Sequence, residues 1–189
     1  MSTDAISILK QDHKEVEQLF RKFEQAGDRA HKSKRSLMDR IVRELSVHAA
    51  IEELIMYPAA RETLDDDDPV LEALEEHHIV KWTLSELERM DPTHARFDAK
   101  AKVLFEMVRH HVEEEESELF PALRDKLGRT RLSEIGEALM QAKKAAPTRP
   151  HPRMPDQPPG NVLGGMAMAA GDRVIDLTRD IKEKVSGKR

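Results

Sequence analysis

One pattern of histidine and glutamate residues occurs twice in this chain. Residues 48–58 and 111–121 both read His, any three residues, Glu-Glu, any three residues, an aromatic residue and Pro. The matching pairs are His48 and His111, Glu52 and Glu115, Glu53 and Glu116, and Tyr57 and Phe120. Side chains four residues apart in an α-helix lie on one face, about 6 Å apart along the axis. Each copy therefore predicts an imidazole and a carboxylate that bind the same cation.

A single histidine precedes each copy at almost the same distance, His13 before the first copy and His77 before the second. All six of these side chains lie on apolar helical stripes that should face a core. Burying two carboxylates without a cation costs on the order of several kcal/mol per charge. We therefore predict a centre that holds two metal ions. Its ligands are His13, His48, Glu52, His77, His111 and Glu115.

Four segments with helical periodicity would position these side chains. In each segment, apolar residues recur at spacings of three and four, and the predicted ligands occupy the same stripe. The segments are residues 6–23, 37–59, 71–87 and 101–122. They are separated or ended by Gly27-Asp28, the acidic run 65–68, Asp91-Pro92 and Gly128. Four such helices with short connections predict an all-α fold, an antiparallel four-helix bundle with the ligands in its core.

The chain continues beyond this bundle with segments of different composition. Residues 129–146 are amphipathic and predict an additional helix packed on or near the bundle. Most of the ten prolines follow residue 146 and predict an extended linker, which leads into an amphipathic C-terminal segment. We therefore divide the chain into the bundle (1–128), the additional helix (129–146) and the linker with its terminal segment (147–189). The terminal segment is expected to dock on the bundle, on a protein partner or on a second copy.

Composition and charge narrow the class of protein. Hydrophobic residues make up 39% of the chain and aromatic residues only 4%, which favours a helical core over a β-sandwich. The 36 acidic and 31 basic residues are mixed along the chain, so no nucleic-acid surface is expected. The absence of cysteine excludes disulfides and thiolate metal sites. Because there is neither a secretory signal pattern nor an apolar run of about 18 residues, we expect a cytoplasmic protein without a membrane span.

The other histidines and glutamates are assigned different roles. His78 and His110 stand next to predicted ligands, but the apolar stripe and the repeat favour their neighbours, so both are expected to flank the site. The histidines expected in solvent are His31, His94 and His151. The further glutamates of the two copies are expected to form a solvated face. Glu53 and Glu116 keep an alternative role as hydrogen-bond partners of the ligand imidazoles.

Tyr57, the only tyrosine, is a candidate seventh ligand. A phenolate is a hard anionic donor that favours Fe(III). In an ideal α-helix, however, Tyr57 lies about 140° around the axis from Glu52. Pro58 would distort this turn and redirect the ring. Two roles therefore stay open for Tyr57, a metal ligand or a core tyrosine beside a kink.

The types of ligand are compatible with several metals. Imidazole and carboxylate without thiolate suit iron, manganese or zinc. Two glutamates that bridge two ions, with two histidines on each ion, leave open coordination positions on both. Open positions indicate reaction with a small molecule rather than a purely structural site.

At these residues the chain resembles the hemerythrin-like family, also called the HHE cation-binding domain. The family motif, H…HxxxE…H…HxxxE, is filled at every ligand position and covers about residues 4–127. The Pro-rich linker and terminal amphipathic segment resemble those of actinobacterial members, including mycobacterial ones. The resemblance implies two non-heme iron ions, an oxo or hydroxo bridge, and reaction with O2, hydrogen peroxide or nitric oxide.

Two departures separate the chain from the oxygen-carrying hemerythrins that it resembles. Those proteins have a second histidine four residues after the third-helix histidine, at the position of Lys81 in this chain. They also have HxxxxD in the fourth helix, whereas this chain has Glu115 in HxxxE spacing. One imidazole fewer implies a more open site that is less suited to reversible O2 binding. The resemblance to mycobacterial members favours hydrogen peroxide decomposition instead.

These observations lead to a main prediction and to alternatives from other classes. The main prediction is a di-iron protein that decomposes hydrogen peroxide in a catalase-like reaction, with no catalytic residues beyond the metal ligands. The alternative is a sensor or regulator of O2, nitric oxide, redox state or iron that acts through a partner of the terminal segment. Oxygen carriage and iron storage are weaker alternatives, because of the missing imidazole and because nothing indicates a shell-forming oligomer.

Overall fold

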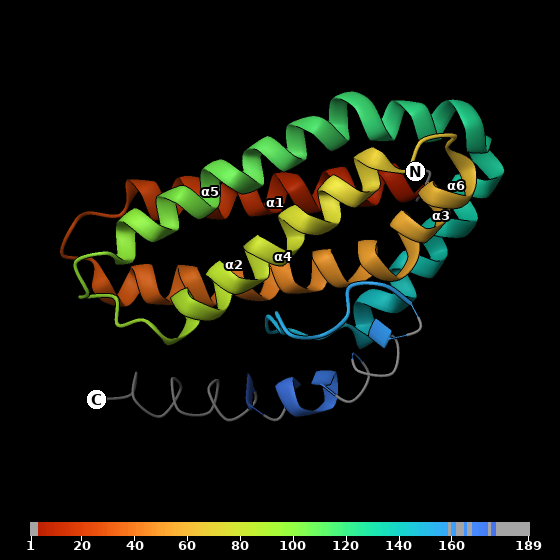
Figure 1. The fold of residues 1–189 in the computed structure, drawn as a ribbon. Coiled ribbons are helices and arrows are strands. Elements are labelled where there is room, and N and C mark those ends of the chain that lie inside the picture. The colour runs from red at the N-terminus through yellow and green to blue at the C-terminus, as the bar shows by residue number, and fades with distance from the viewer. Residues whose placement is uncertain (1–3, 159, 162–164, 166–167, 174, 177–189) are drawn as a thin grey trace.

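The computed structural model describes residues 4–158, 160–161, 165, 168–173 and 175–176. Among these residues the secondary structure is helical (Figure 1). The elements are α1 (Ala5–Gln25), α2 (His31–Ile51), η1 (Glu52–Met56), α3 (Tyr57–Thr63), α4 (Asp68–Arg89), α5 (Phe97–Glu114), η2 (Glu115–Leu119) and α6 (Phe120–Ala145). Two of the long rods are composite, since η1 joins α2 to α3 and η2 joins α5 to α6.

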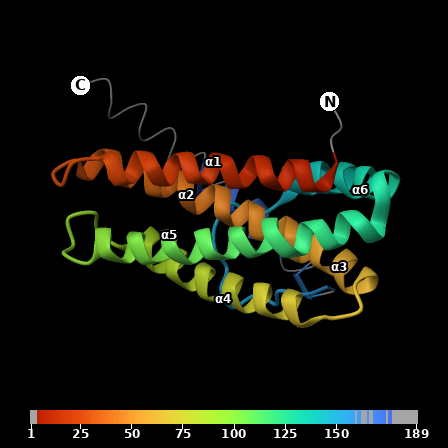
Figure 2. The same ribbon diagram turned by 90° about the horizontal axis from the view of Figure 1, so that it is seen from above.

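The four long rods form an antiparallel bundle, which confirms the predicted all-α fold class. Helix α1 packs against α2 and α5, and α4 packs against α5 and α2 (Figure 2). Local sequence explains where the rods begin. The side chain of Asp4 accepts a hydrogen bond from the Ser7 backbone amide at 3.0 Å and caps α1. Pro69 occupies the first turn of α4, where its missing N–H leaves no bond unmade.

Each copy of the repeat contains a π-helical turn, which the sequence pattern does not predict. In η1 the Tyr57 amide donates to the Glu52 carbonyl, and in η2 the Phe120 amide donates to the Glu115 carbonyl. These are bonds to the fifth preceding residue instead of the fourth. A proline follows each aromatic residue, and its ring removes one N–H donor from the helical ladder. The widened turns therefore lie where the ladder is already interrupted.

The hydrophobic core consists of two clusters separated by a polar layer. One cluster includes Leu9, Ile51 and Leu119, and the other includes Val16 and Leu45. The six predicted ligands lie along the helices between these clusters, and all are buried. The packing on both sides therefore fixes the polar layer in place.

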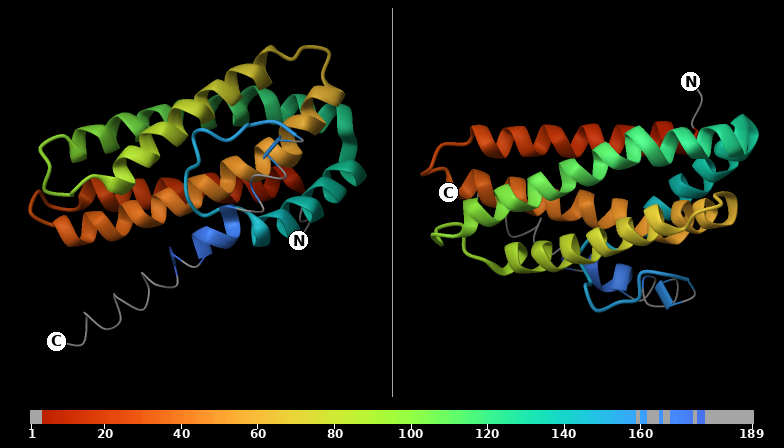
Figure 3. Two further views of the ribbon diagram at one scale, coloured as in Figure 1. Left: turned by 60° about the horizontal axis from the view of Figure 1, so that its bottom comes forward. Right: turned by 45° about the horizontal axis from the view of Figure 1, so that its top comes forward.

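After the bundle, the chain reverses at Gly128, where φ is +69° and ψ is 174°. Few residues other than glycine adopt this backbone conformation. The reversal lets Leu132, Ile135 and Leu139 pack into the same cluster as Leu9 of α1. Because these three residues are buried, the second part of α6 covers one end of the bundle (Figure 3).

The described residues after α6 lie along α2 (Figure 3). The guanidinium of Arg149 contacts Glu88 and Asp176, and the Asn161 amide donates to the Glu53 carbonyl at 3.2 Å. Most of the predicted amphipathic terminal segment, residues 177–189, lies outside the described residues. Within the described part of the chain, none of the helices is both long enough and apolar enough to span a membrane.

Candidate metal centre

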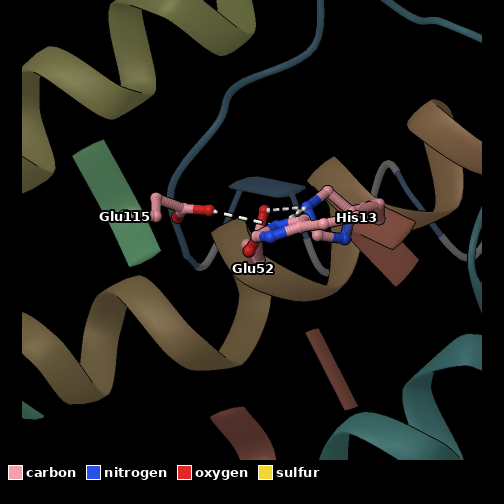
Figure 4. Close-up of side chains that lie close together, drawn as sticks. His13, Glu52 and Glu115 are labelled. Carbon is pink, nitrogen blue, oxygen red and sulfur yellow. Dashed lines mark hydrogen bonds and ion pairs between the residues drawn. The ribbon is translucent and has the colours of Figure 1, made fainter. Parts of the chain in front are cut away.

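The fold brings all six predicted ligands to one place in the bundle core. His13, His48, Glu52 and Glu115 form one group whose ligand atoms lie within 4.8 Å of one another. Glu52 also belongs to a second such group, with His77 and His111. The side chains come from α1, α2, α4, α5 and the two π-turns, so every long rod contributes. Figure 4 shows the carboxylate of Glu115 reaching toward His13, with Glu52 beside them.

The distances arrange the imidazoles in two pairs with a carboxylate between the pairs. His13 Nε2 lies 3.2 Å from His48 Nε2, and His77 Nε2 lies 3.1 Å from His111 Nε2. Glu52 Oε2 is 3.0 Å from His48 Nε2 and 3.5 Å from His77 Nε2.

The second carboxylate repeats this arrangement. Glu115 Oε2 is 3.3 Å from His13 Nε2 and 3.6 Å from His111 Nε2. Each glutamate therefore contacts one imidazole of each pair. This is the arrangement that two ions need if two carboxylates are to bridge them.

The outer nitrogen of every central imidazole faces a further carboxylate. Two of these carboxylates are Glu116, whose Oε1 is 2.9 Å from His13 Nδ1, and Glu53, whose Oε1 is 3.1 Å from His77 Nδ1. These two contacts confirm that Glu116 and Glu53 are hydrogen-bond partners of the imidazoles, the alternative that the sequence left open. An acceptor on Nδ1 fixes the tautomer that leaves Nε2 free to bind a metal.

The other two carboxylates, Asp12 and Glu76, were not identified from the sequence. Asp12 Oδ2 lies 3.7 Å from His48 Nδ1, and Glu76 Oε2 lies 2.7 Å from His111 Nδ1. The signal was present, because an acidic residue directly precedes each of the two single histidines, His13 and His77. In each half of the chain, this acidic residue faces Nδ1 of the other histidine, His48 or His111.

The expected solvated position of Glu53 is wrong. Its side chain is buried, and both of its oxygens pair with the Lys81 ammonium, at 2.8 and 3.0 Å. Lys81, at the position of the missing imidazole, therefore contacts the carboxylate behind His77. This ion pair compensates the charge of Glu53, which is why the carboxylate tolerates burial.

Tyr57 lies at the centre, on the side of the second imidazole pair. Its hydroxyl donates to Glu115 Oε1 at 3.0 Å and lies 3.2 Å from His77 Nε2. The π-turn accounts for this position, because the extra residue in the turn brings Tyr57 round toward the face that carries Glu52. Phe120, its counterpart in the second copy, stacks on His13 with ring centroids 5.8 Å apart.

The charges of the protein groups favour a cation at this position. Burial lowers the pKa of His48, but the carboxylates of Glu52 and Asp12 outweigh burial and raise this pKa to about 10. Burial raises the pKa of Glu115, but the surrounding imidazoles, His111 first among them, lower it to about 2. Burial, followed by the neighbouring carboxylates, raises the pKa of Tyr57 well above its usual value.

The carboxylate oxygens of the centre give a second reason to expect a divalent metal. Both oxygens of Glu52 and Oε2 of Glu115 are buried and form no hydrogen bond within the described part of the chain. A buried acceptor without a hydrogen bond loses its hydration, and the imidazole nitrogens at 3.0 to 3.6 Å compensate that loss only through their charge. Metal ions held between these oxygens and the Nε2 atoms would compensate that loss.

A cavity of about 270 Å³ lies against the imidazoles. All four central histidines contribute to its lining, together with apolar side chains that include Phe20 and Val108. Arg109 also lines it and pairs with Glu17 at 2.9 Å. The centre thus faces a mostly apolar space large enough for a small molecule.

Comparison with known proteins points to a family of cation-binding domains. Residues 4–123 match the hemerythrin HHE cation binding domain. An uncharacterized hemerythrin-like protein of Schizosaccharomyces pombe is 26% identical over 175 residues, covering 92% of this chain and 83% of that protein. A DNA nickase of Nostoc sp. is 29% identical over 164 residues, or 87% of this chain. The match spans only 42% of the nickase.

A solved structure leads to the same family. The crystal structure of a hemerythrin HHE cation binding domain-containing protein from Mycobacterium kansasii superposes with a TM-score of 0.65 and 26% identity. The superposition covers 75% of this chain and 85% of that one. With the domain match over residues 4–123 and a buried set of histidine and glutamate side chains that could hold a metal, the chain belongs to the hemerythrin HHE cation-binding domain family.

Proposed function

We propose that this protein holds two non-heme iron ions and decomposes hydrogen peroxide. One ion would bind His13 and His48 and the other His77 and His111, while Glu52 and Glu115 bridge them. The observation that carries the proposal is that each glutamate contacts one imidazole of each pair. Iron bound in this way supplies a metal pair that can change oxidation state by two electrons in total.

Peroxide as the substrate is supported by the chemistry that the surroundings permit. Disproportionation converts two H2O2 into two H2O and one O2, so it requires no external reductant. The cavity of about 270 Å³ accommodates so small a molecule next to all four imidazoles. The Tyr57 hydroxyl, which donates to Glu115 at 3.0 Å, can instead donate its hydrogen bond to an oxygen atom of peroxide in the centre.

Metal analysis and oxygen evolution test this proposal directly. The protein loaded with iron under anaerobic conditions should contain two irons per chain and release O2 from H2O2 at an oxygen electrode. His48→Ala and Glu115→Ala should remove most of this activity. His78→Ala is the matched control, because His78 adjoins a proposed ligand but contacts Trp82 on the outer side of α4. Unchanged turnover in the first two variants would rule out the proposed centre.

The role of Tyr57 can be decided with the same preparation. Its hydroxyl is close enough to the second imidazole pair for ligation after a small shift, and close enough to Glu115 to remain a hydrogen-bond donor. A phenolate bound to Fe(III) gives a visible absorption band. Ligation through the phenolate is the alternative to this donor role, and in that case Tyr57→Phe loses the band. Identical spectra would leave Tyr57 as a hydrogen-bond donor.

A sensor that acts through the C-terminal segment is the second candidate. The contact that favours it is the hydrogen bond from Asn161 to the carbonyl of Glu53, whose side chain holds His77. A change at the metal could therefore reach residues after α6. Deletion of residues 147–189 separates the candidates, because a catalyst would keep its peroxide turnover. A sensor would retain its iron spectrum and lose partner binding.

The activity named for the Nostoc relative is not part of this proposal. The match covers only 42% of that protein. Acidic and basic residues are mixed along this chain, with 36 of the former and 31 of the latter. This balance gives no reason to expect phosphate-backbone binding.

A further inference from the structure

A second cavity, of about 170 Å³, connects the surface near the start of α4 with the centre. Its sides are lined by six carboxylates, Asp66, Asp68, Glu72, Glu76, Glu114 and Glu118. Glu115 and His111, two of the six predicted ligands, also line it. No lysine or arginine belongs to the described lining. The cavity is therefore strongly negative and reaches the metal centre.

Burial increases from the mouth of this acidic cavity toward the centre. Glu72 and Glu118 are exposed, Glu76 and Glu114 are half-buried, and Glu115 is only 2% exposed. The buried Oε2 of Glu115 forms no hydrogen bond with any described residue. The inner end of the cavity thus presents a buried carboxylate oxygen with unused hydrogen-bonding capacity, which lies 3.3 Å from His13 Nε2 and 3.6 Å from His111 Nε2.

The carboxylates of the cavity have no lysine or arginine partner among the described residues. Glu76 pairs with His111 and Glu114 with His110, and within the described part of the chain none of the six forms an ion pair with lysine or arginine. Neighbouring carboxylates such as Asp65 and Asp67 do have such partners, in Lys126 and Arg61. Carboxylates that outnumber the basic side chains around one concavity focus a potential that attracts cations.

The surface hollow near His13 is not strongly negative. This hollow is lined by three basic residues, Lys10, Lys14 and Arg109, and by three acidic ones, Glu17, Glu113 and Glu116. Its charges balance, so it offers a divalent cation no comparable attraction. The apolar cavity beside the imidazoles has little polar surface for a hydrated ion.

We propose that the acidic cavity is the port through which divalent cations reach the buried centre. Glu76 and Glu114 of its lining provide an intermediate stop together with the exposed His110, because the ligand atoms of the three lie within 4.8 Å of one another. From there the ion passes to His111 and Glu115. This proposal rests on the metal-binding function proposed above, and it concerns the rate of loading instead of the final affinity.

Loading kinetics with Co²⁺ alone test the port in the full-length chain. Metal-free protein is mixed with Co²⁺ in a stopped-flow instrument, and the visible bands of the bound ion are followed. The port variant is Asp68→Asn/Glu72→Gln/Glu118→Gln, whose three residues are exposed and belong to none of the groups that could hold a metal. It should load roughly tenfold more slowly at low ionic strength, with the same final absorbance. The difference should shrink at about 0.5 M salt.

A control variant with the same change in charge is Glu62→Gln/Asp125→Asn/Glu137→Gln, at exposed positions away from this cavity. It should load at the wild-type rate. Glu72→Lys/Glu118→Lys should be slower than the port variant. Equal rates in the port and control variants, or a lower final absorbance in the port variant, would overturn the port. If the wild type binds no Co²⁺, the metal centre itself fails and the port fails with it.

Discussion

Each central imidazole has Nε2 at the centre and a carboxylate near Nδ1, within hydrogen-bond distance for His13, His77 and His111 and at 3.7 Å for His48. His13 and His111 illustrate the arrangement, with Nε2 directed at the centre and Nδ1 close to Glu116 and Glu76, respectively. A carboxylate on Nδ1 orients the ring and increases the basicity of Nε2. The affinity of the centre therefore depends on residues that never touch the ion.

Glu116→Gln should weaken metal binding by about 10–100-fold, because a neutral amide orients His13 less firmly and lowers the basicity of its Nε2. Glu113→Gln is the matched control, since Glu113 is an exposed glutamate one turn earlier. A competitive titration with a chelator measures both affinities. If the two variants bind equally, the contact between Glu116 and His13 does not influence the metal.

The sequence indicated the central residues better than those behind them. The six central side chains could be predicted because repetition and helical spacing place them on core-facing stripes. Asp12 and Glu76 escaped prediction because each orients a histidine on a different helix, His48 and His111. Contacts between helices depend on how the helices pack, and the residue pattern along one helix does not show this.

Among the elements, the ordinary helices follow from apolar periodicity and the π-turns do not. A π-turn inserts one residue without altering the composition on either side, so the apolar pattern carries no mark of it. The best available signal was the proline after each aromatic residue, Pro58 and Pro121. The angle of about 140° expected between Glu52 and Tyr57 in an ideal helix therefore does not apply.

The chain reversal inside α6 gives a prediction at this scale. Gly128 has a positive φ of 69°, and a Cβ atom added there would meet none of the surrounding residues within 4 Å. A substitution at this position is therefore strained by the backbone conformation alone. Gly128→Ala should cost about 1–3 kcal/mol. This corresponds to a melting temperature lower by several degrees, at about 2–4 °C per kcal/mol for a chain of this size.

Gly27→Ala is the control for this experiment. Gly27 also has free space around it, but its φ lies outside the positive range. Thermal melts of the two variants should differ clearly, with Gly27→Ala close to the wild type. Equal melting temperatures would mean that the reversal at Gly128 is not needed for the packing of Leu132 and Leu139.

At the scale of the whole molecule, the polar layer makes the bundle dependent on what it binds. The two apolar clusters lie on opposite sides of the layer, and the ligand atoms of Glu52 and Glu115 lie within 4.8 Å of each other in it. Like charges at close range repel, and each loses hydration on burial. Cations between them would therefore stabilise the complete bundle and not one helix.

The metal-loaded protein should for this reason melt well above the metal-free protein. A ligand that binds only the folded state stabilises it by RT ln(1 + [L]/Kd), which is about 4 kcal/mol at a thousandfold excess over Kd. The difference in melting temperature between the loaded and metal-free forms should shrink in Glu52→Gln/Glu115→Gln. Neutral amides remove both the repulsion between the two carboxylates and the anionic metal ligands. Thermal melts of four samples, loaded and metal-free for each protein, measure the two differences. A wild-type protein that melts at the same temperature with and without metal would show that this buried layer is not a metal site.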